Sequence, residues 1–393
     1  MKKFLLHFYN VIADVCEMAV GELKAIFRDE GLLIFAILLP LAYPVLYSWI
    51  YNNEVVREVP LAVVDASHSS LGREFVRRCD ASPDVHVTYH CNNLDEARQL
   101  VGRQQVYGVL YLPEDFATKL NRMEQTTVSL YCNMGLMLTY KALYQTATAV
   151  ASDMNANIQT QLSGNYTNRE NEISTRPLDF EEVPMFNNTG GYGNFILPGV
   201  LVLIIQQVLL LTVGMGWGTR RENREFGPWR TIYERPMGLL RIVGGNTLAY
   251  LLLFTVLSAY VLLVVPRMFS FVQLLHAKDY VLLLLPYLLA CIFFAISASI
   301  LVRRREDVML LVVFTSVPLL FLSGVSWPGS NIPEFWRICS YIFPSTFGIQ
   351  GFIKLNTMGA VFADIVPEVR AMWLQAAVYL VLACIVVRRQ VRR

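Results

Sequence analysis

Six stretches of the chain are long, apolar and free of Asp, Glu, Lys, Arg and His. They are Gly31–Ile50, Phe195–Trp217, Ile242–Val265, Tyr280–Val302, Val308–Trp327 and Ala371–Val387. Because an α-helix needs about 20 apolar residues to cross about 30 Å of hydrocarbon, each stretch has roughly the length of a transmembrane helix. The composition agrees, since 54% of the 393 residues are hydrophobic and 16% are charged, against about 25% in soluble domains. The sequence therefore predicts an integral membrane protein with six transmembrane α-helices.

Net charge and cysteine spacing argue against several other classes of protein. The 33 Lys and Arg against 31 Asp and Glu leave a net charge of +2, so no overall basic excess favours a nucleic-acid partner. The seven cysteines form no C-x-x-C pair and no Cys/His cluster, so we expect no bound metal. Cys79, Cys91 and Cys132 lie in the one long polar region, where one disulfide or free cysteines both fit.

Basic residues alternate between the connections that join the six stretches. Two connections and the C-terminal segment carry thirteen arginines: Arg220, Arg221, Arg224, Arg230, Arg235, Arg241, Arg303, Arg304, Arg305, Arg388, Arg389, Arg392 and Arg393. The other short connections carry five basic residues: Arg267, Lys278, Arg337, Lys354 and Arg370. Because Lys and Arg in short loops remain on the cytoplasmic side, both termini are predicted to be cytoplasmic and segment 52–194 extracytoplasmic.

The first thirty residues mix apolar and charged side chains. Apolar residues recur at roughly helical spacing from Phe4 to Phe27. The segment is too long and too mixed in charge for a cleaved signal peptide, so we interpret the stretch that follows as a retained anchor. Residues 1–30 fit either an amphipathic helix in the cytoplasmic membrane interface or a soluble helix packed on a partner. Their position beside the first membrane stretch favours the interface.

Segment 52–194 has the pattern of a folded α/β domain. Runs of β-branched and aromatic residues predict strands at Pro60–Asp65, Val85–His90, Val106–Leu112 and Thr127–Tyr131. Helical patterns are found at Ser70–Arg78, Leu94–Gln104 and, as one long helix, Leu136–Leu162. Tyr166–Asn194 is predicted as a return loop. Alternating strands and helices favour a mixed sheet, and we predict no catalytic residues because no acid, base and nucleophile converge by spacing.

None of the six stretches contains Asp, Glu, Lys, Arg or His. Proton- or ion-driven transport needs such groups at membrane depth, so secondary active transport is not favoured. The chain also lacks the G-x-x-x-x-G-K-[ST] motif for binding ATP. If ATP drives transport, a separate ATPase subunit must bind the ATP and Mg²⁺ and push on a loop of this chain, which itself binds no cofactor.

Two arginine-rich loops are candidates for that contact. Loop 219–236 combines mixed charge with Phe226, Trp229, Ile232 and Tyr233, which suits a short amphipathic helix that docks in a cleft. Its candidate contact residues are Arg221, Arg224, Glu225, Gly227, Trp229, Arg230 and Pro236. The second candidate consists of Arg303, Arg304, Arg305, Glu306 and Asp307. On charge alone, loops without a partner explain both segments equally well.

The spacing in loop 219–236 resembles a family signature. Arg224-Glu225, then Gly227, then Pro236 is similar to the Arg-Glu-x-Gly-Thr-x-Glu...Pro pattern after the second span of ABC-2 type permeases, the membrane subunits of a class of ABC transporters. Pro228 stands where that family usually has Thr, and Arg230 where it often has Glu. The layout of the chain most resembles the branch with a large periplasmic domain, which exports drugs or other small molecules with a membrane-fusion partner.

A second region resembles the same family. Leu322–Pro328, Ile332-Pro333, Phe343-Pro344 and Gly351–Gly359 are similar to the Ser-Gly and proline pattern that follows its fifth span. The resemblance implies that residues 326–360 re-enter the outer leaflet as short broken helices, a re-entrant hairpin suited to an outer gate. Such a stretch is tolerated at membrane depth only where protein or water satisfies its backbone. A plain external loop is the alternative.

Several polar, glycine and proline residues are candidates for the transport path or its gate. They are Gln206, Gln207, Ser323, Gly324, Pro328 and Pro344. The two glutamines lie in the middle of the second stretch, where interhelical hydrogen bonding is the more common role. Gly214 and Gly218 form a small-xxx-small pair that predicts close helix packing.

Together, the residues and the resemblance predict a permease subunit of an ATP-driven exporter for small amphipathic, drug-like or lipid-like molecules. The domains are 1–30 (interfacial helix), 31–51 (first transmembrane helix), 52–194 (extracytoplasmic α/β domain) and 195–393 (five-helix transmembrane domain). Expected partners are two ABC ATPase subunits, a second copy or a homologous permease, membrane lipid, and a periplasmic membrane-fusion adaptor with an outer-membrane channel. The expected location is the bacterial inner membrane. The alternative is a non-transporting receptor, against which weighs the end of the chain six residues after the last stretch.

Overall fold

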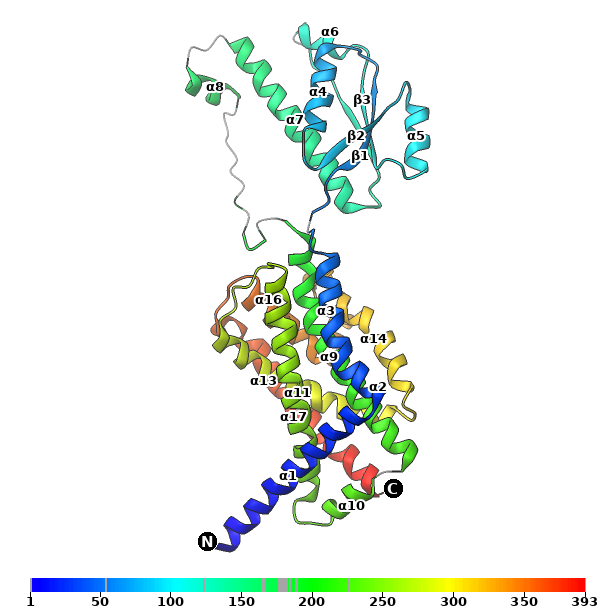
Figure 1. The fold of residues 1–393 in the computed structure, drawn as a ribbon. Coiled ribbons are helices and arrows are strands. Elements are labelled where there is room, and N and C mark those ends of the chain that lie inside the picture. Colours follow the sequence, from blue (N-terminus) through cyan, green and yellow to red (C-terminus); the bar gives the residue numbers. More distant parts are fainter. Residues whose placement is uncertain are drawn as a thin grey trace. The chain divides into compact units, whose positions relative to one another are not determined.

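The computed structural model describes residues 2–53, 55–122, 124–163, 167–175, 183, 185–187, 190–224 and 226–392. The chain divides into two compact units (Figure 1). Met1–Glu54 and Pro184–Arg393 form a helical unit, and Val55–Val183 form an α/β unit inserted into it along the sequence. We refer to them as the helical unit and the inserted unit.

Among the described residues, five helices are long and apolar enough to cross a membrane. They are Glu30–Ile50, Tyr192–Asn223, Gly238–Met268, Ala277–Leu301 and Phe362–Arg392. Each coincides with one of the predicted stretches. The stretch predicted at Val308–Trp327 forms the shorter helix α14 (Asp307–Leu322), which has 16 residues. At 1.5 Å per residue α14 is about 24 Å long, less than the roughly 30 Å of bilayer hydrocarbon.

Two of the five long helices contain a π-helical turn. The first consists of α2 (Glu30–Leu33), the π turn η1 (Ile34–Leu38) and α3 (Leu39–Ile50). The third consists of α11 (Gly238–Ala259), the π turn η2 (Tyr260–Val264) and α12 (Val265–Met268). Pro40 and Pro266 follow closely after these turns. Because proline has no N–H to donate and crowds the preceding turn, the wider turn accommodates it without ending the helix.

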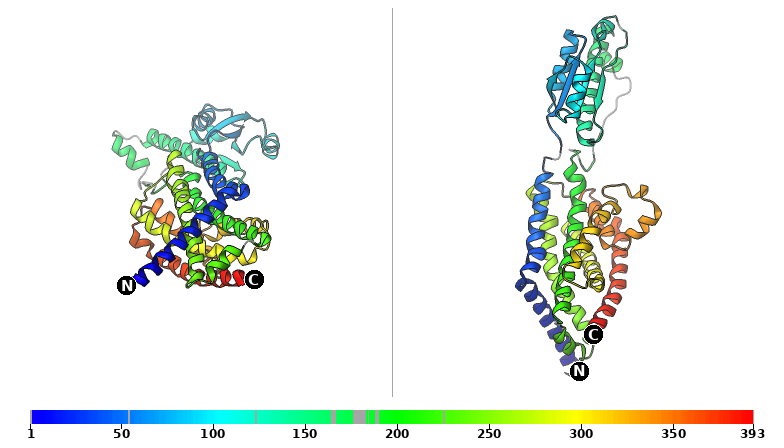
Figure 2. Two further views of the ribbon diagram at one scale, coloured as in Figure 1. Left: turned by 60° about the horizontal axis from the view of Figure 1, so that its bottom comes forward. Right: turned by 90° about the vertical axis from the view of Figure 1, so that its right-hand side faces the viewer.

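Helix α9 (Tyr192–Asn223) forms the centre of the helical unit. It packs against α13 (Ala277–Ala298), α16 (Pro344–Asn356), α14 and α3. Figure 2 shows it between the side of the bundle formed by α3 and the side formed by α17 (Val366–Arg392). In its apolar window 89% of the residues are buried. A helix that is apolar on every side is stable where other helices surround it, which explains this central position.

The remaining helices pack around α9. Helix α13 packs along α17, and α1 (Lys2–Arg28) packs along α11. The short elements of the helical unit are α10 (Gly227–Tyr233), α15 (Glu334–Ser340), η3 (Ser299–Leu301), η4 (Gly329–Asn331) and η5 (Phe362–Ile365). Segment 326–360 thus contains short helices, and α16 is buried against α9, α13 and α17.

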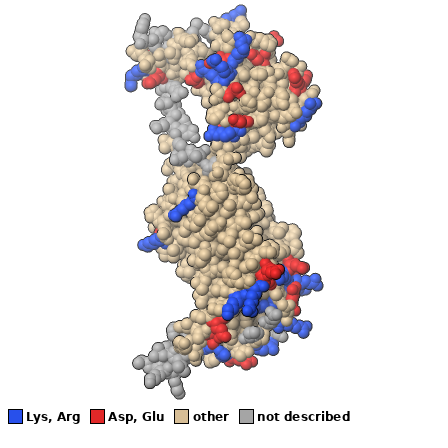
Figure 3. Space-filling model, viewed as in Figure 1, with Lys and Arg blue, Asp and Glu red and all other residues tan. Residues whose placement is uncertain are grey.

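Charged side chains of the helical unit gather near its ends. On the face shown in Figure 3, a broad band between the ends carries no Lys, Arg, Asp or Glu. Helix α10, the N-terminus of α1 and the C-terminus of α17 lie at the same end (Figure 1). We call it the arginine-rich end, because it contains the arginine-rich connections that the sequence pattern assigns to one side of a membrane.

The inserted unit contains a four-stranded sheet with the strand order β2-β1-β3-β4. Its strands are β1 (Val59–Asp65), β2 (Val85–His90), β3 (Gly108–Leu112) and β4 (Ser129–Cys132). Strand β1 pairs in parallel with β2 and β3, and β4 pairs antiparallel with β3. The predicted mixed sheet is confirmed, and the strand ends differ from the prediction by at most two residues.

Helices cover the two faces of this sheet unequally. Helices α4 (Ser70–Asp80) and α7 (Met137–Ser163) pack on one face, and α5 (Leu94–Gly102) packs on the other. The connection from β1 to β2 and the connection from β2 to β3 run in opposite directions across the sheet. Because such connections are right-handed as a rule, their helices α4 and α5 lie on opposite faces. Large side chains such as Phe75 and Leu143 fill the first layer. Smaller side chains, among them Ala62, Ala97 and Val109, form the layer under α5.

Local signals explain the helix starts of this unit. Asn93 caps α5 as predicted, because its Oδ1 accepts the Glu96 N–H at 2.8 Å. Beyond the short helix α6 (Phe116–Asn121), α8 (Asn168–Thr175) lies in the segment predicted as a loop. Glu170 N–H donates to Thr167 Oγ1 at 3.3 Å and Thr167 N–H to Glu170 Oε2 at 3.2 Å. This Thr-x-x-Glu capping box was the signal that the sequence prediction missed.

All seven cysteines lie among the described residues, and all are free. For Cys79, Cys91 and Cys132 the structure therefore has free thiols rather than a disulfide. Burial raises the pKa of the Cys79 thiol to about 12 and that of Cys132 to about 11. Such thiols are weak nucleophiles at neutral pH, which favours a structural role.

Candidate functional site

The loop predicted to contact an ATPase contains the short helix α10, whose Trp229 side chain is buried. Trp229 is 5% exposed, and its ring packs edge-on against Trp217 and Phe226 at centroid distances of 5.2 Å and 5.6 Å. The guanidinium carbon of Arg220 lies 4.9 Å from the centre of the same ring. Trp229 therefore fixes α10 on the end of α9. It is not exposed as a contact residue, contrary to the expectation from the sequence.

The other predicted residues of this loop are either anchored or exposed. Arg221 donates to Gln390 Oε1 at 3.4 Å and to the Ser299 carbonyl at 3.2 Å. Arg230 is exposed and donates to the Val391 carbonyl at 3.4 Å. Arg224, Gly227 and Pro236 are exposed, and Glu225 lies outside the described residues.

Exposed side chains of α10 and the residue after it form a small polar surface. It consists of Arg230, Thr231 and Glu234, which we call the α10 surface. Arg224 ends α9 in the left-handed conformation, with φ of 56°. The chain therefore turns sharply between α9 and α10, and the α10 surface points away from the contacts made by Trp229.

Glu22 of α1 lies at the centre of a buried polar cluster. Arg220 donates to both of its carboxylate oxygens, with an Nη1–Oε1 distance of 3.1 Å for one bond. The Tyr250 hydroxyl donates to Oε1 at 2.5 Å. Since a buried charge is stable only when it is paired and hydrogen-bonded, this cluster fixes α1 against α9 and α11.

Asp14 forms a second buried cluster two turns earlier on α1. Arg235 donates to Oδ1 at 2.6 Å and Arg241 donates to Oδ2. Burial raises the pKa of Asp14, but the hydrogen bonds and positive charges of Arg235 and Arg241 outweigh it and lower that pKa below 3.8. Because Arg235 follows α10 and Arg241 begins α11, Asp14 ties α1 to the segment between them.

Asp29 binds the second arginine-rich turn. Arg305 donates to its two carboxylate oxygens at 2.9 Å and 2.5 Å. The backbone N–H of Arg305 donates to Glu222 at 3.1 Å. The contacts of Arg305 thus join this turn to the start of the first long helix and to the end of α9.

Hydrogen bonds within the turn itself hold its other residues. Asp307 Oδ2 accepts the backbone N–H groups of Arg303 and Arg304 at 2.9 Å and 2.8 Å. Glu306 is exposed. The two candidate loops meet at Gly218 of α9, where a Cβ would lie 2.9 Å from the Cα of Arg305. The structure therefore brings both predicted loops to one site at the arginine-rich end.

Asp14, Glu22 and Asp29 are not among the site residues predicted from the sequence. Their spacing of eight and seven residues was the available signal, because two helical turns place side chains on one side of a helix. Asp14 and Glu22 lie on one side of α1, and Asp29 follows directly after its end. Carboxylates repeated in this way, followed by arginine-rich loops, indicate ion pairing between them. The candidate site is thus larger than loop 219–236 and includes α1.

The two faces of α1 have different environments. On one face, α1 approaches α11 so closely that a Cβ at Gly245 would lie 2.4 Å from Met18 Cβ. Apolar side chains remain exposed elsewhere on α1: Tyr9 (71%), Ile12 (47%), Val20 (50%) and Phe27 (57%). The helix therefore packs on α11 of its own chain and retains an apolar surface that suits a membrane interface.

Gln206 and Gln207 differ in their contacts. Gln206 is 1% exposed, and its Oε1 accepts the Ser345 N–H at 2.6 Å, beside Pro344 at the start of α16. Gln207 Nε2 donates to Thr315 Oγ1 of α14 at 3.4 Å. Both residues therefore form interhelical hydrogen bonds, with Gln206 capping the N-terminus of α16.

The other predicted gate residues lie around the end of α14. Ser323 is buried, and its carbonyl accepts from Gln350 of α16 at 3.4 Å. Gly324 has φ of 89°, a left-handed conformation that ends α14 and favours glycine. Pro328 is exposed. The structure thus brings Gln206, Ser323 and Pro344 to α16.

The fold alone shows which class of protein this is. It is a multi-pass membrane protein in which an α/β unit is inserted after the first long apolar helix. A family model described as ABC-2 family transporter protein matches residues 31–385. The chain therefore belongs to the ABC-2 transporter family and is a membrane permease component of an ABC transporter, which implies an ABC ATPase partner in general. A comparison with curated proteins gives no match.

Proposed function

We propose that the chain is the permease subunit of an ATP-driven exporter whose separate ATPase subunits dock on the α10 surface. The observation that carries the proposal is the combination of an exposed outer side and a fixed inner side in one short helix. Arg230, Thr231 and Glu234 are exposed, while Trp229 is buried beneath them. A partner that binds the outer side would move the whole end of the helical unit.

The contacts of α10 define how such a movement would spread. Trp229 packs on Trp217 of α9, and Arg230 donates to the end of α17. Asp14 joins the following residues to α1 through Arg235. Because these contacts are buried or charged rather than flexible, closing of an ATPase pair would move α9, α17 and α1 together, as in a rigid-body switch between two states.

The chain would lie in a bacterial inner membrane with six spans. Five would be the long apolar helices, and α14 with the turn after it would form the remaining span. The arginine-rich end and both termini would face the cytoplasm, because arginines in short loops remain there. The inserted unit would then be extracytoplasmic. The exposed apolar face of α1 would lie in the cytoplasmic interface, with Tyr9 and Phe27 among the lipids.

Two copies, or one copy with a homologous permease, would enclose the path. Helix α16 would form the inner part of a re-entrant outer hairpin, since Gln206 and surrounding helices satisfy its N-terminus inside protein. Gln206, Gln207, Ser323, Gly324, Pro328 and Pro344 would border this gate. The substrates would be small amphipathic molecules, drug-like or lipid-like, and a periplasmic adaptor with an outer-membrane channel would continue the path.

A charge-swap variant of the α10 surface tests the proposal. The double substitution Arg230→Glu with Glu234→Arg reverses the exposed charges and leaves the net charge unchanged. The matched control is Glu17→Lys with Lys24→Glu, a swap at exposed positions of α1. Each detergent-solubilised chain is purified from its native membrane and the co-purifying subunits are identified.

We expect a P-loop ATPase subunit to co-purify with the wild type and with the α1 control. It should be absent from the purified α10 variant. Nucleotide-dependent transport should follow the same order. A stable wild-type chain that brings down no nucleotide-binding subunit would contradict the proposal and support a receptor. Equal recovery with the α10 variant would move the docking site elsewhere.

A further inference from the structure

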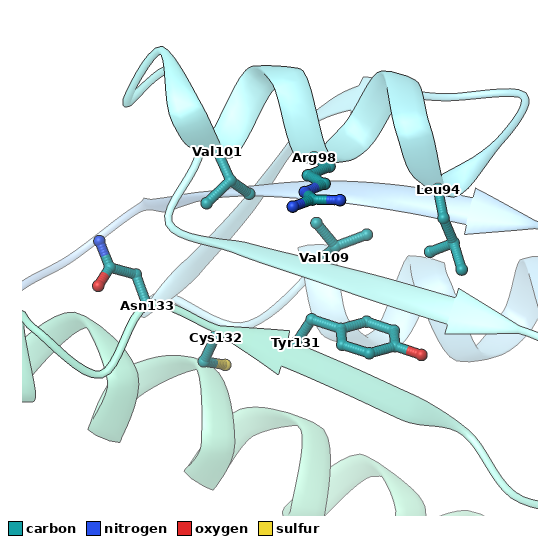
Figure 4. A pocket seen from close by; sticks show the side chains of 7 residues that line it. All are labelled: Leu94, Arg98, Val101, Val109, Tyr131, Cys132 and Asn133. Atoms are coloured by element: carbon teal, nitrogen blue, oxygen red, sulfur yellow. The ribbon is translucent and has the colours of Figure 1, made fainter.

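The inserted unit contains a groove of about 430 Å³ on the α5 face of its sheet (Figure 4). Leu94, Arg98 and Val101 of α5 form one side of it. Val109 of β3 forms the floor, and Tyr131, Cys132 and Asn133 at and after β4 form the other side. The groove lies entirely within the inserted unit.

The groove exists because α5 does not extend over the edge strand. Helix α5 packs on β1 and β3, whereas β4 is packed by α7 on the opposite face. Val109 and Tyr131 are cross-strand neighbours, so both side chains lie on the α5 face. Val109 is 4% exposed, but Tyr131 is 52% exposed because no helix covers it. An apolar floor thus lies beside an uncovered aromatic ring.

Among the residues that the structure describes, Arg98 is the only charged one that lines the groove. Figure 4 shows its side chain between α5 and the strands, beside Val109. Arg98 is exposed, and within the described part of the chain it has no ion pair or hydrogen bond, whereas Arg57, Arg77 and Arg78 of the same unit pair with carboxylates. A guanidinium beside an apolar floor, with no internal counter-ion, is complementary to an anion with an apolar body.

We propose that this groove binds an amphipathic organic anion, a molecule with a ring or short apolar body and a carboxylate or sulfonate group. Its volume lies in the range of roughly 300–1,000 Å³ that is typical of small-molecule sites. The anionic group binds Arg98, the apolar body covers Val109, and Tyr131 contacts its face or edge. This binding site goes beyond the proposed transport function and does not depend on it.

A second cavity of the inserted unit is less suited to an anion. It has about 510 Å³ and lies at the carboxyl ends of β1 and β2. Asp65 and Asp80 line it together with Arg73 and Arg77. Arg77 already pairs with Glu74. Because both signs of charge are present there, the complementarity that carries the proposal is found at Arg98.

Equilibrium dialysis of the full chain in lipid nanodiscs tests the proposal without ATP or any partner subunit. The probe is 1-naphthalenesulfonate, and the neutral analogue is 1-naphthalenemethanol. Empty nanodiscs measure partition into lipid, which is subtracted. The variant is Arg98→Gln, and the matched control is Arg103→Gln, at an exposed position just after α5 that does not line the groove.

The expected result is saturable sulfonate binding that Arg98→Gln weakens about tenfold or more, as loss of a charge-assisted contact does. Arg103→Gln should leave it within about twofold, because this charge does not line the groove and salt screens it from the bound anion. The neutral analogue should bind weakly and equally to all variants. Equal sulfonate binding to the wild type and Arg98→Gln overturns the proposal, as does retention no greater than that of empty nanodiscs.

A second pair of variants keeps Arg98 in place. Leu94→Glu puts a carboxylate four residues before Arg98, where the two side chains pair across one helical turn. Leu94→Gln removes the same apolar contact without adding a charge. If an anion binds Arg98, the glutamate variant loses much more sulfonate affinity than the glutamine variant. Equal affinities would contradict the proposed role of the guanidinium.

Discussion

Glu22 and Arg220 form a buried ion pair between α1 and α9, with 4% and 14% of the two side chains exposed. Arg220 also lies against the ring of Trp229, so one guanidinium contacts both the N-terminal helix and the base of α10. The pair therefore connects two segments that are almost two hundred residues apart in the sequence.

Glu22→Ala should destabilise the chain by about 3–5 kcal/mol, because it leaves the Arg220 charge buried without its counter-ion. It also removes the acceptor of the Tyr250 hydroxyl. The measurement is denaturant unfolding of the purified chain in detergent. Glu17→Ala, at an exposed position of the same helix, is the control and should change the unfolding free energy by less than about 0.5 kcal/mol.

A double variant separates the lost pair from lost packing. Adding Arg220→Met to Glu22→Ala removes the unpaired charge, so part of the stability should return. If the double variant is destabilised by the full sum of the two single effects, Glu22 and Arg220 do not interact as a pair.

Asp14→Asn should lower stability most at neutral pH and least in acid. Arg235 and Arg241 lower the pKa of folded Asp14 below 3.8, so the carboxylate stabilises the fold at pH values above 3.8. This contribution is lost as the pH falls through the lower folded pKa, because both states are then protonated. Thermal unfolding of wild type and variant between about pH 3 and 7 measures the difference. A difference that stays constant across this range would contradict the assignment.

Gln206→Leu should destabilise the chain by about 1–3 kcal/mol, since the buried Ser345 N–H loses its acceptor. Amide hydrogen exchange should rise at the start of α16. The neighbouring Gln207→Leu is the matched control. Its longer bond to Thr315 and unpartnered Oε1 predict an effect near zero. Equal effects of both variants would show that Gln206 does not hold α16.

The apolar pattern predicted the long helices and the strands because burial in lipid or in a sheet depends on side-chain type and period alone. The length of α14 was overestimated. Its stretch continues to Trp327 in composition, but the helix ends at Leu322 because Gly324 adopts a left-handed conformation. Composition does not record that backbone turn.

The site was harder to predict because it depends on which distant residues meet. Trp229 has the composition of an interface anchor, yet the fold places Trp217, Phe226 and Arg220 around it. Nothing local to residues 219–236 indicates this burial. The pairing of Glu22 with Arg220 likewise depends on the packing of α1 on α11, which the two alternatives drawn from the sequence did not include.

Gly214 and Gly218 are confirmed as the close-packed pair that their spacing predicted. A Cβ at Gly214 would lie 2.3 Å from Val308 Cγ2, and one at Gly218 would lie 2.9 Å from Arg305 Cα. Gly216 lies between them on another side of the helix, where the nearest atom would be 3.8 Å away. The three glycines therefore offer a comparison within one helix.

Gly214→Ala and Gly218→Ala should each destabilise the chain by about 1–3 kcal/mol, because α14 and the Arg305 turn must move away from α9. Gly216→Ala should be neutral or stabilising by up to about 1 kcal/mol, since alanine favours the helix and the added methyl group fits.

Of these three glycines, only Gly218 contacts the turn that binds Asp29. Gly218→Ala should therefore also weaken the Asp29–Arg305 pair. Asp29→Asn should then lower the stability less in that background than in the wild type. Thermal unfolding of the three single variants and the Gly218→Ala, Asp29→Asn double variant measures this. Equal tolerance of alanine at all three positions would contradict the close approach of α9 to the second arginine-rich turn.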